Sequence, residues 1–358
     1  MYSRSWCEID LTIIKDNYLR FCELLAPKQR IMAVVKANAY GHGGVEISRA
    51  LQNAGCKAFA VALASEAIEL RRNGIIGDIL VLGYTPVNEV KALADMDISQ
   101  SVYSTDYADE VIKACNSLKV HLAIDTGMRR YGFDASDKSL PSMLEKYLNC
   151  LNVQGIFTHL SRADCSKESK FTAKQIEKFK KTIDIFELKP RCVHYANTSG
   201  FLKYNDNFAN FVRVGIGLYG LGENLPKGAT PALTWKSQIV DVRKVKRGDC
   251  VGYGKGYKVK KDMKIATVST GYADGYSRAL SNRGVVKIGN RFAKIVGNVC
   301  MDAFMIDVTQ IESVSLGDEV ILLGEGLCAG DMAKRINTID YEIVTKISQR
   351  VERFYKKY

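Results

Sequence analysis

Short apolar runs alternate with amphipathic segments over the first two thirds of the chain. The runs that predict β-strands are Ile31–Val35, Ala58–Ala62, Ile79–Leu82, Ile98–Tyr103, Val120–Ile124, Val153–Thr158, Cys192–Tyr195 and Val212–Ile216. Segments with helical spacing of apolar residues lie between them, among them Val45–Ala54, Ser65–Asn73, Asp106–Ser117 and Thr172–Phe186. Eight strands separated by helices predict an α/β fold of the (β/α)8 TIM-barrel type.

The pattern changes near residue 235, where strand-like runs follow one another without helices between them. These runs are Ser237–Val245, Met263–Ser269, Gly284–Ile288, Phe292–Val296, Phe304–Val308 and Glu319–Leu323. Gly-containing turns separate the runs, and helical patterns follow near Gly330–Asn337 and Ile339–Val351. We therefore expect a barrel over residues 1–235 and a smaller, mostly β domain over residues 236–358.

Composition removes several classes of protein. The 358 residues are 47% hydrophobic and 25% charged, and no apolar run approaches the roughly 20 residues that span a bilayer. The first thirty residues mix acids and bases, so we expect no signal peptide, no membrane contact and a cytoplasmic protein. The ten cysteines form no C-x-x-C pair, which predicts neither a zinc site nor a disulfide framework, and we expect no metal. The net charge of +12 is spread along the chain without a nucleic-acid-binding motif, so no nucleic-acid partner is expected.

Candidate chemistry gathers where the barrel strands end, because working residues of this fold lie on the loops that follow the strands. Lys36 directly follows the apolar run IMAVV. Burial there lowers the pKa of a lysine and favours the neutral amine that attacks an aldehyde. An ordinary lysine leaving a barrel strand is the competing interpretation.

A phosphate site is predicted at the same end of the barrel. Small residues and hydroxyls that suit a phosphate follow the first, seventh and eighth strands: Tyr40, Asn197, Thr198, Ser199, Gly215 and Ile216. A lysine beside a phosphate cradle indicates a phosphorylated aldehyde, which is pyridoxal 5'-phosphate.

Motifs along nearly the whole chain resemble those of the alanine racemase family. In order, they are AVVKANAYGHG (33–43), DTGMRRYG (125–132), GIFTHLSRAD (155–164), HYANTSG (194–200), RVGIGLYGL (213–221), VGYGKGY (251–257), TGYADGY (270–276) and VGNVCMD (296–302). The resemblance implies a fold-type III pyridoxal-phosphate enzyme that racemises alanine and supplies D-alanine for peptidoglycan. It also implies a homodimer in which the second domain of each subunit completes the active site of the partner.

The resemblance assigns a role to each matching residue. Lys36 would bind the cofactor covalently and act as one base, and Tyr272 of the other subunit would be the base on the opposite face of the substrate. Arg213 would contact the pyridine nitrogen, and His159 would hold Arg213 in place. Arg130 would bind the cofactor's phenolic oxygen and the substrate carboxylate, and the backbone N–H of Met301 would help to bind that carboxylate. The residues implied to shape that corner are Cys300 and Asp302, and those implied to hold the phosphate are Tyr40, Thr198, Gly215 and Ile216.

Two positions depart from the family pattern. Many members carry a carbamylated lysine two residues before the aspartate of DTGM, where this chain has Ala123. Something else must then steady Arg130, such as a bound anion. Gln349 in KISQRVERF stands where the family has a tyrosine that touches the phosphate and lines the substrate pocket. Tyr84 in LGYTP is a further candidate for the cofactor mouth, with a structural role as its alternative.

The Gln349 departure keeps an alternative substrate open. A smaller amide could admit a side-chain hydroxyl, as in the serine racemases linked to vancomycin resistance, and hydroxyl rejection by an apolar pocket is weak. A fold-type III decarboxylase should carry a Gly-Gly-Gly phosphate loop, which is absent here. A non-catalytic pyridoxal-phosphate-binding protein should lack the second domain. The chain could also be the racemase part of a longer membrane-associated protein.

Overall fold

The computed structural model describes residues 4–165, 169–186 and 190–356, which divide into two compact units. One unit contains residues 14–39 and 44–229 and is called the barrel unit here. The other contains residues 4–13, 40–43 and 230–356 of those described and is called the β unit. The β unit therefore includes the first strand of the chain and a short segment after Lys36, which a single boundary at residue 235 would leave in the barrel.

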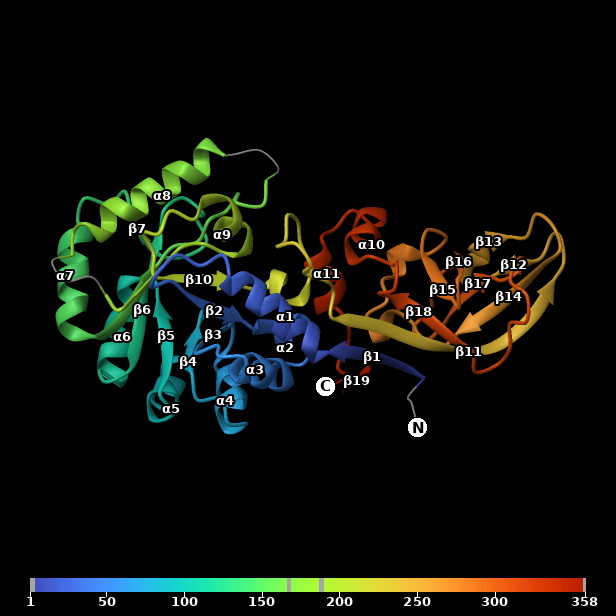
Figure 1. The fold of residues 1–358 in the computed structure, drawn as a ribbon, viewed down its shortest axis with the longest axis horizontal. Coiled ribbons are helices and arrows are strands. Elements are labelled where there is room, and N and C mark those ends of the chain that lie inside the picture. The colour runs from blue at the N-terminus through green and yellow to red at the C-terminus, as the bar shows by residue number, and fades with distance from the viewer. Residues whose placement is uncertain (1–3, 166–168, 187–189, 357–358) are drawn as a thin grey trace. The chain divides into compact units, whose positions relative to one another are not determined.

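Eight parallel strands form a closed barrel in the barrel unit (Figure 1). They are β2 (Arg30–Val34), β3 (Ala58–Val61), β4 (Asp78–Val81), β5 (Ile98–Val102), β6 (Lys119–Asp125), β8 (Asn152–Phe157), β9 (Cys192–His194) and β10 (Phe211–Val214). Neighbours pair in chain order, and the pairing of β10 with β2 closes the ring. Most positions of these strands are buried because a parallel barrel strand is covered on both faces, and β5 (ISQSV) even buries polar side chains. The predicted (β/α)8 fold is confirmed.

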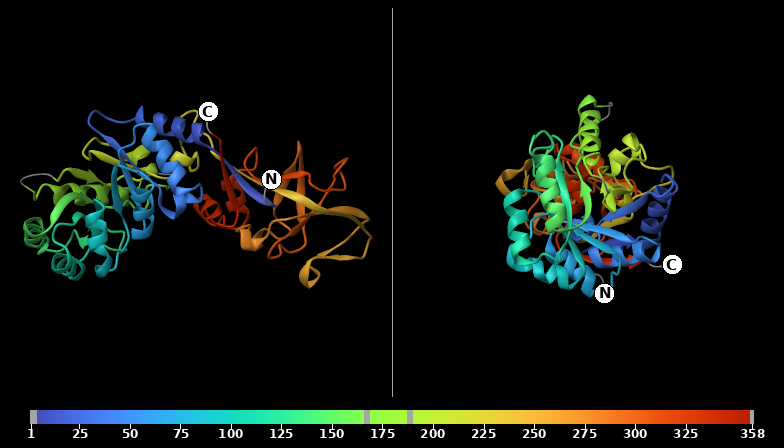
Figure 2. Two further views of the ribbon diagram at one scale, coloured as in Figure 1. Left: turned by 90° about the horizontal axis from the view of Figure 1, so that it is seen from below. Right: turned by 90° about the vertical axis from the view of Figure 1, so that its left-hand side faces the viewer.

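Helices lie outside the barrel strands (Figure 2). They are α1 (Leu11–Cys22), α3 (Gly44–Asn53), α4 (Ala64–Arg72), α5 (Val90–Asp95), α6 (Thr105–Ala114), α7 (Leu140–Cys150) and α8 (Lys170–Ile183), with the short α9 (Thr198–Tyr204) after β9. In α6, for example, the Ser104 hydroxyl accepts from the backbone N–H of Tyr107 and caps the first turn. The apolar face of α6 buries Tyr107, Ala108 and Val111. A two-residue strand, β7 (Phe133–Asp134), pairs with the end of β6.

The β unit is built on an eight-stranded sheet. Its strands are β1 (Ser5–Asp10), β11 (Leu233–Val245), β14 (Met263–Val268), β15 (Val285–Ile288), β16 (Arg291–Val296), β17 (Phe304–Asp307), β18 (Glu319–Leu323) and β19 (Glu352–Lys356). A small hairpin joins β12 (Cys250–Val251) to β13 (Tyr257–Lys258), and two helices, α10 (Ala329–Arg335) and α11 (Asp340–Thr345), precede β19. Most strands pair antiparallel, as the absence of intervening helices predicts.

One helix expected from the sequence is wrong over its second half. The pattern predicts a helix to Val351, but α11 ends at Thr345. The Arg353 guanidinium binds the carbonyls of Ile347, Ser348 and Val351 and so holds this segment as a turn. The chain then forms β19, which pairs in parallel with β1. Neither β1 nor β19 was expected from the sequence.

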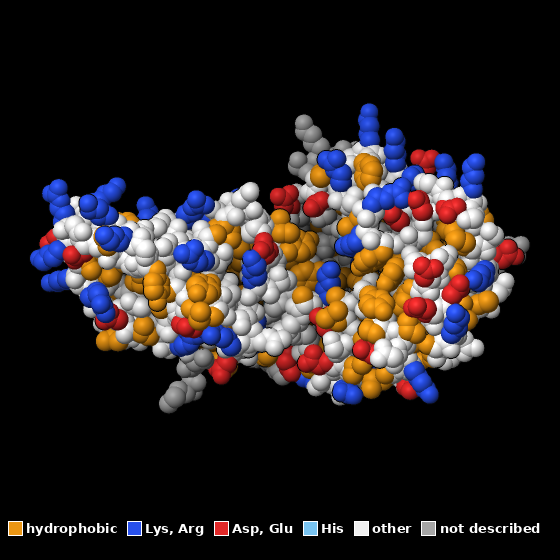
Figure 3. Space-filling view, turned by 180° about the vertical axis from the view of Figure 1, so that it is seen from behind, with side chains coloured by type: hydrophobic (Ala, Val, Ile, Leu, Met, Phe, Trp, Pro, Cys, Tyr) orange, Lys and Arg blue, Asp and Glu red, His pale blue; other side chains and the backbone are white. Residues whose placement is uncertain are grey.

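The surface carries charges of both signs on each unit. On the face in Figure 3, Lys and Arg side chains are spread over both units and Asp and Glu lie among them. No helix among the described residues combines the length and apolar character needed to cross a membrane.

Candidate active site

Lys36 begins an unusual turn directly after β2. Ala37, Asn38, Ala39 and Tyr40 all have φ between 51° and 53°, which makes this short segment, α2 (Lys36–Tyr40), a left-handed turn. Such a conformation costs a residue with a side chain about 1–2 kcal/mol. Four successive residues in this region are a strained feature, and strain of this kind clusters at functional sites.

The Lys36 amine lies in a cationic environment. Burial lowers the pKa of Lys36, and the positive charges of Arg130 and Arg213 lower it further, while Glu66 acts in the opposite direction. Among the described residues, no hydrogen bond or ion pair engages the amine. A lysine without an acidic partner is favoured as the neutral nucleophile that condenses with a carbonyl group.

Arg213 points from β10 into the barrel and is held entirely by neutral acceptors. Its guanidinium lies 2.7 Å from Nδ1 of His194 and 3.1 Å from Nδ1 of His159. It also donates to the carbonyls of Thr158 (2.9 Å) and Tyr195 (3.1 Å). Burial and the nearby charge of Arg130 lower the pKa of Arg213 to about 9. The predicted contact between His159 and Arg213 is present, and burial together with Arg213 lowers the pKa of His159 to about 3.

The loops after β9 and β10 meet through a side chain that was predicted to hold phosphate. The Thr198 hydroxyl accepts a hydrogen bond from the backbone N–H of Gly215 at 3.0 Å. Ile216 begins a single 3-10 turn, η2 (Ile216–Tyr219), in which a Cβ at Gly217 would overlap Thr198 and the ring of Phe21. The loops therefore form a close-packed turn in which Gly217 allows the close approach of Thr198 and Phe21. Asn197 supports this turn by capping α9, because its side chain accepts from the N–H of Gly200.

Arg130 lies on the loop after β6. Its guanidinium lies over the ring of Tyr131, 5.1 Å from the centroid, and within the described ranges it makes no ion pair. Ala123 is buried on β6 and offers no polar group, so the side chain that steadies this arginine in many relatives has no counterpart here. The ring centroid of Tyr84 lies 5.4 Å from that of Tyr107.

Tyr272 lies in the β unit, in the turn η4 (Tyr272–Asp274) after β14. Its backbone N–H donates to the carbonyl of Cys300 at 3.0 Å, and the next N–H donates to the carbonyl of Met301. Tyr272 is 42% exposed and Met301 is 54% exposed, so neither residue is buried within the unit. The structure therefore places Tyr272, Cys300 and Met301 together, as the resemblance implies.

A buried carboxylate fixes this corner of the β unit. Asp274 accepts from the N–H of Gly271 (2.8 Å) and from the guanidinium groups of Arg4 (2.8 Å) and Arg350 (2.6 Å). Arg350 also binds Asp302 at 2.5 Å. The N–H of Ser348 donates to the Asp274 carbonyl, which brings the segment that contains Gln349 to the same corner.

Tyr40 does not belong to the same unit as the other predicted phosphate residues. It is part of the β unit, where its ring lies 6.0 Å from the ring of Tyr341. The predicted site residues therefore form two groups. The barrel unit holds Lys36, Arg130, His159, Arg213 and the turn formed by Thr198, Gly215 and Ile216. The β unit holds Tyr40 and the group Tyr272, Cys300, Met301 and Asp302, called the Tyr272 corner here.

Three residues that hold site side chains in place were not predicted from the sequence: His194, His121 and Asp274. His194 opens the motif HYANTSG but was assigned no role, and His121 was not singled out at all. Asp274 stands inside TGYADGY, and its pairing with Arg350 joins positions far apart in sequence. No signal in the sequence separates the two histidines from other core residues, because nearly every position of β6 and β9 is buried.

Comparison with known families covers both units. The family model for the alanine racemase N-terminal domain matches residues 9–223, and the model for the C-terminal domain matches residues 232–355. An alanine racemase of Clostridium perfringens is 44% identical over 98% of this chain and 95% of its own length.

Solved structures of alanine racemases also match nearly the whole chain. The alanine racemase of Bacillus anthracis with bound L-Ala-P superposes with a TM-score of 0.92 at 35% identity, over 100% of this chain and 96% of that chain. The alanine racemase of Bartonella henselae with covalently bound pyridoxal phosphate superposes with a TM-score of 0.91 at 29% identity, over 99% of this chain and all of that chain.

Proposed function

The chain belongs to the alanine racemase family, and from this premise we propose that it interconverts L- and D-alanine with Lys36 and Tyr272 as the two bases. Nearly full-length relatives of 36–44% identity support an isomerase of this kind. The serine racemase and decarboxylase alternatives are not favoured.

The observation that carries the proposal is the cationic mouth of the barrel. A half-buried lysine amine that makes no ion pair among the described residues lies in the field of Arg130 and Arg213, in the same unit as the close-packed turn that joins Thr198 to Gly215. The lysine suits a carbonyl group, and the turn suits a phosphate. One ligand that has both groups is pyridoxal 5'-phosphate, the cofactor that is covalently bound in the Bartonella henselae structure.

The donor set fits this cofactor. Lys36 would hold it covalently, Thr198, Gly215 and Ile216 would hold its phosphate, and Arg213 would meet its ring nitrogen. The cofactor supplies an electron sink that makes the α-proton of an amino acid acidic. Arg213 is a donor with no acidic partner, so it favours an unprotonated ring nitrogen and a weaker sink. A weaker sink favours return of the proton to the α-carbon over transamination.

Racemisation needs two proton carriers on opposite faces of the α-carbon. Lys36 would hold or remove the proton at its Nζ on one face, and Tyr272 would do so at its Oη on the other. Arg130 and the N–H of Met301 would bind the substrate carboxylate, with Cys300, Asp302 and Gln349 around it.

The protein would act as a homodimer with shared sites. Lys36 and Tyr272 belong to different units of the chain, and the Tyr272 corner is exposed. An exposed corner that carries a base is suited to complete the barrel mouth of a second copy. In the cell, the D-alanine product would enter peptidoglycan.

The direct test is racemisation of L-alanine and of L-serine by the cofactor-loaded protein, followed by chiral chromatography. We expect a clear preference for alanine in kcat/KM. Equal or faster turnover of serine would overturn the alanine assignment and identify Gln349 as the residue to exchange for tyrosine. Covalent cofactor binding without racemisation of either amino acid would contradict the proposed reaction while leaving the fold unaffected.

A further inference from the structure

Two histidines connect Arg213 to the opposite end of the barrel. The Arg213 guanidinium lies 2.7 Å from Nδ1 of His194, and Nε2 of His194 lies 2.9 Å from Nδ1 of His121. The three residues are 3%, 0% and 4% exposed, respectively. They stand on β10, β9 and β6, so the chain of hydrogen bonds crosses the barrel interior.

The chemistry of the donors fixes the tautomer of each ring. A guanidinium only donates, so Nδ1 of His194 carries no proton and accepts. The neutral ring then carries its proton on Nε2 and donates it to Nδ1 of His121. Nδ1 of His121 is therefore also unprotonated, and the proton of that ring is on Nε2. Each of the two hydrogen bonds therefore has one permitted donor-to-acceptor direction, from Arg213 to His194 and from His194 to His121.

A second proton on either ring would break the chain, because an N–H would then face another N–H. Burial and the charges of Arg191 and Arg213 lower the pKa of His121 to about 3. Burial, Arg213 and His121 lower the pKa of His194 well below its usual value. Both rings are therefore neutral across the physiological range, which keeps both links intact.

The neighbouring strand β8 supplies close packing around both histidines. The ring of His194 stacks on Phe157 with a centroid distance of 4.9 Å and an interplanar angle of 4°. The Arg213 guanidinium lies over the same ring at 5.4 Å. At Gly155, a Cβ would overlap the ring of His121, so glycine provides the space that the ring occupies.

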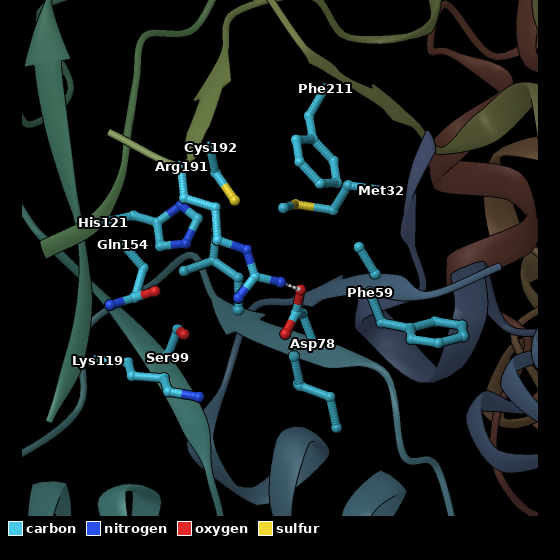
Figure 4. A pocket seen from close by; sticks show the side chains of 13 residues that line it. Met32, Phe59, Asp78, Ser99, Lys119, His121, Gln154, Arg191, Cys192 and Phe211 are labelled. Carbon is cyan, nitrogen blue, oxygen red and sulfur yellow. Dashed lines mark hydrogen bonds and ion pairs between the residues drawn. The ribbon is translucent and has the colours of Figure 1, made fainter. Parts of the chain in front are cut away.

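The series of hydrogen bonds ends at His121, beside a small cavity among the amino-terminal ends of the barrel strands. His121 lines it together with Ser99, Gln154 and Arg191, and the Arg191–Asp78 ion pair lies beside it (Figure 4). The cavity volume is about 20 Å³, which is room for one water molecule. Within the part of the chain that the structure describes, Nε2 of His121 has no protein acceptor, so its N–H can donate a hydrogen bond to a water there.

We propose that His194 and His121 are positioning residues that hold the Arg213 guanidinium in one orientation through the fixed donor order of the Arg213–His194–His121 chain. The inference rests on the proposed function in one respect: the group that Arg213 faces is the cofactor ring of that proposal. Neutral acceptors suit this task because a carboxylate in their place would neutralise the guanidinium. Arg213 thus keeps its full charge while its rotation is restricted.

The first test needs no variant and no activity. The chain has four histidines, so ¹⁵N-histidine labelling gives a sparse spectrum of the full-length protein. We expect three neutral rings with the proton on Nε2, those of His121, His194 and His159, because Nδ1 of each accepts a hydrogen bond, and we expect them unchanged from pH 8 to pH 6 in both cofactor-free and cofactor-loaded protein. Loss of one of these signals in His121→Asn assigns it. A cationic ring, or a proton on Nδ1, at His121 or His194 would overturn the proposal whether or not the protein is a racemase.

The second test uses matched variants. Asn can place its Oδ1 near the position of Nδ1, so His121→Asn retains an acceptor for His194, whereas His121→Leu removes it. We expect His121→Leu to weaken cofactor binding about five- to tenfold and to raise the fraction of transamination per racemisation. His121→Asn should stay within about twofold of the natural protein. Equal effects of the two variants on both readouts would contradict a positioning role, and if His121→Leu does not fold, the tautomer measurement still decides.

Discussion

Arg213 and Lys36 are two cations at one barrel mouth, and neither has a carboxylate partner among the residues in the described ranges. Buried charges are usually paired, because desolvation makes an unpaired one costly. Here desolvation acts on two groups whose chemistry depends on it. It makes the amine of Lys36 easier to deprotonate, and it leaves the Arg213 guanidinium as a donor without a compensating negative charge. A bound phosphate and carboxylate would supply the missing negative charge, so ligand binding should stabilise the barrel unit.

The buried histidines make stability depend on pH. The pKa of His121 is about 3 in the folded protein, against an ordinary value of 6.5. Above pH 6.5 both states are neutral there, and the stability is fully present. Between pH 6.5 and 3 the unfolded chain binds a proton that the folded chain excludes, so stability falls by up to about 1.4 kcal/mol per pH unit. From pH 6 to pH 5, urea unfolding of the natural protein should lose about 1 kcal/mol more than that of His121→Asn. Parallel losses would show that His121 is protonated in the folded state.

At the scale of elements, the most unusual feature is the left-handed turn after β2. It reverses the usual handedness over residues 37–40 and so changes the direction of the chain directly after Lys36. None of these four residues is glycine, the residue type that adopts such φ values without strain. Tertiary packing must therefore impose the turn: Ala39 is fully buried, and the Asn38 side chain accepts a hydrogen bond from the N–H of Gly44 at 2.6 Å.

Ala37 allows this strain to be measured, because its side chain is exposed and a change there leaves packing intact. Ala37→Gly should raise stability by about 0.5–1 kcal/mol, since glycine adopts a φ of 52° without strain. Ala37→Val should lower stability by more than about 1 kcal/mol, because a β-branched side chain is strongly disfavoured at positive φ. Chemical denaturation of the two variants side by side measures both effects. A stabilising Val or a destabilising Gly would mean that the turn is not left-handed in solution.

At the scale of the whole molecule, the barrel was more predictable than the β unit. Its strands contain short apolar runs with helical patterns between most of them, and each signal is local. Strand β19 was missed because its sequence, ERFYK, is mostly polar and it forms only where β1 offers a pairing edge. Motifs located the site residues, but the His194–His121 link joins positions 73 residues apart, and each histidine alone resembles an ordinary core residue.

The division of the two proposed bases between units leads to a test of the whole assembly. Lys36→Ala and Tyr272→Ala chains should each be inactive, because each lacks one proton carrier. If sites are shared between subunits, a mixed dimer has one site with both bases and one with neither. Random exchange at equal amounts makes about half of the dimers mixed, so about a quarter of the natural activity per chain should return. The control is a mixture of two separately labelled Lys36→Ala preparations, which verifies exchange and should stay inactive. No recovery after verified exchange would mean that each chain supplies both bases to its own site.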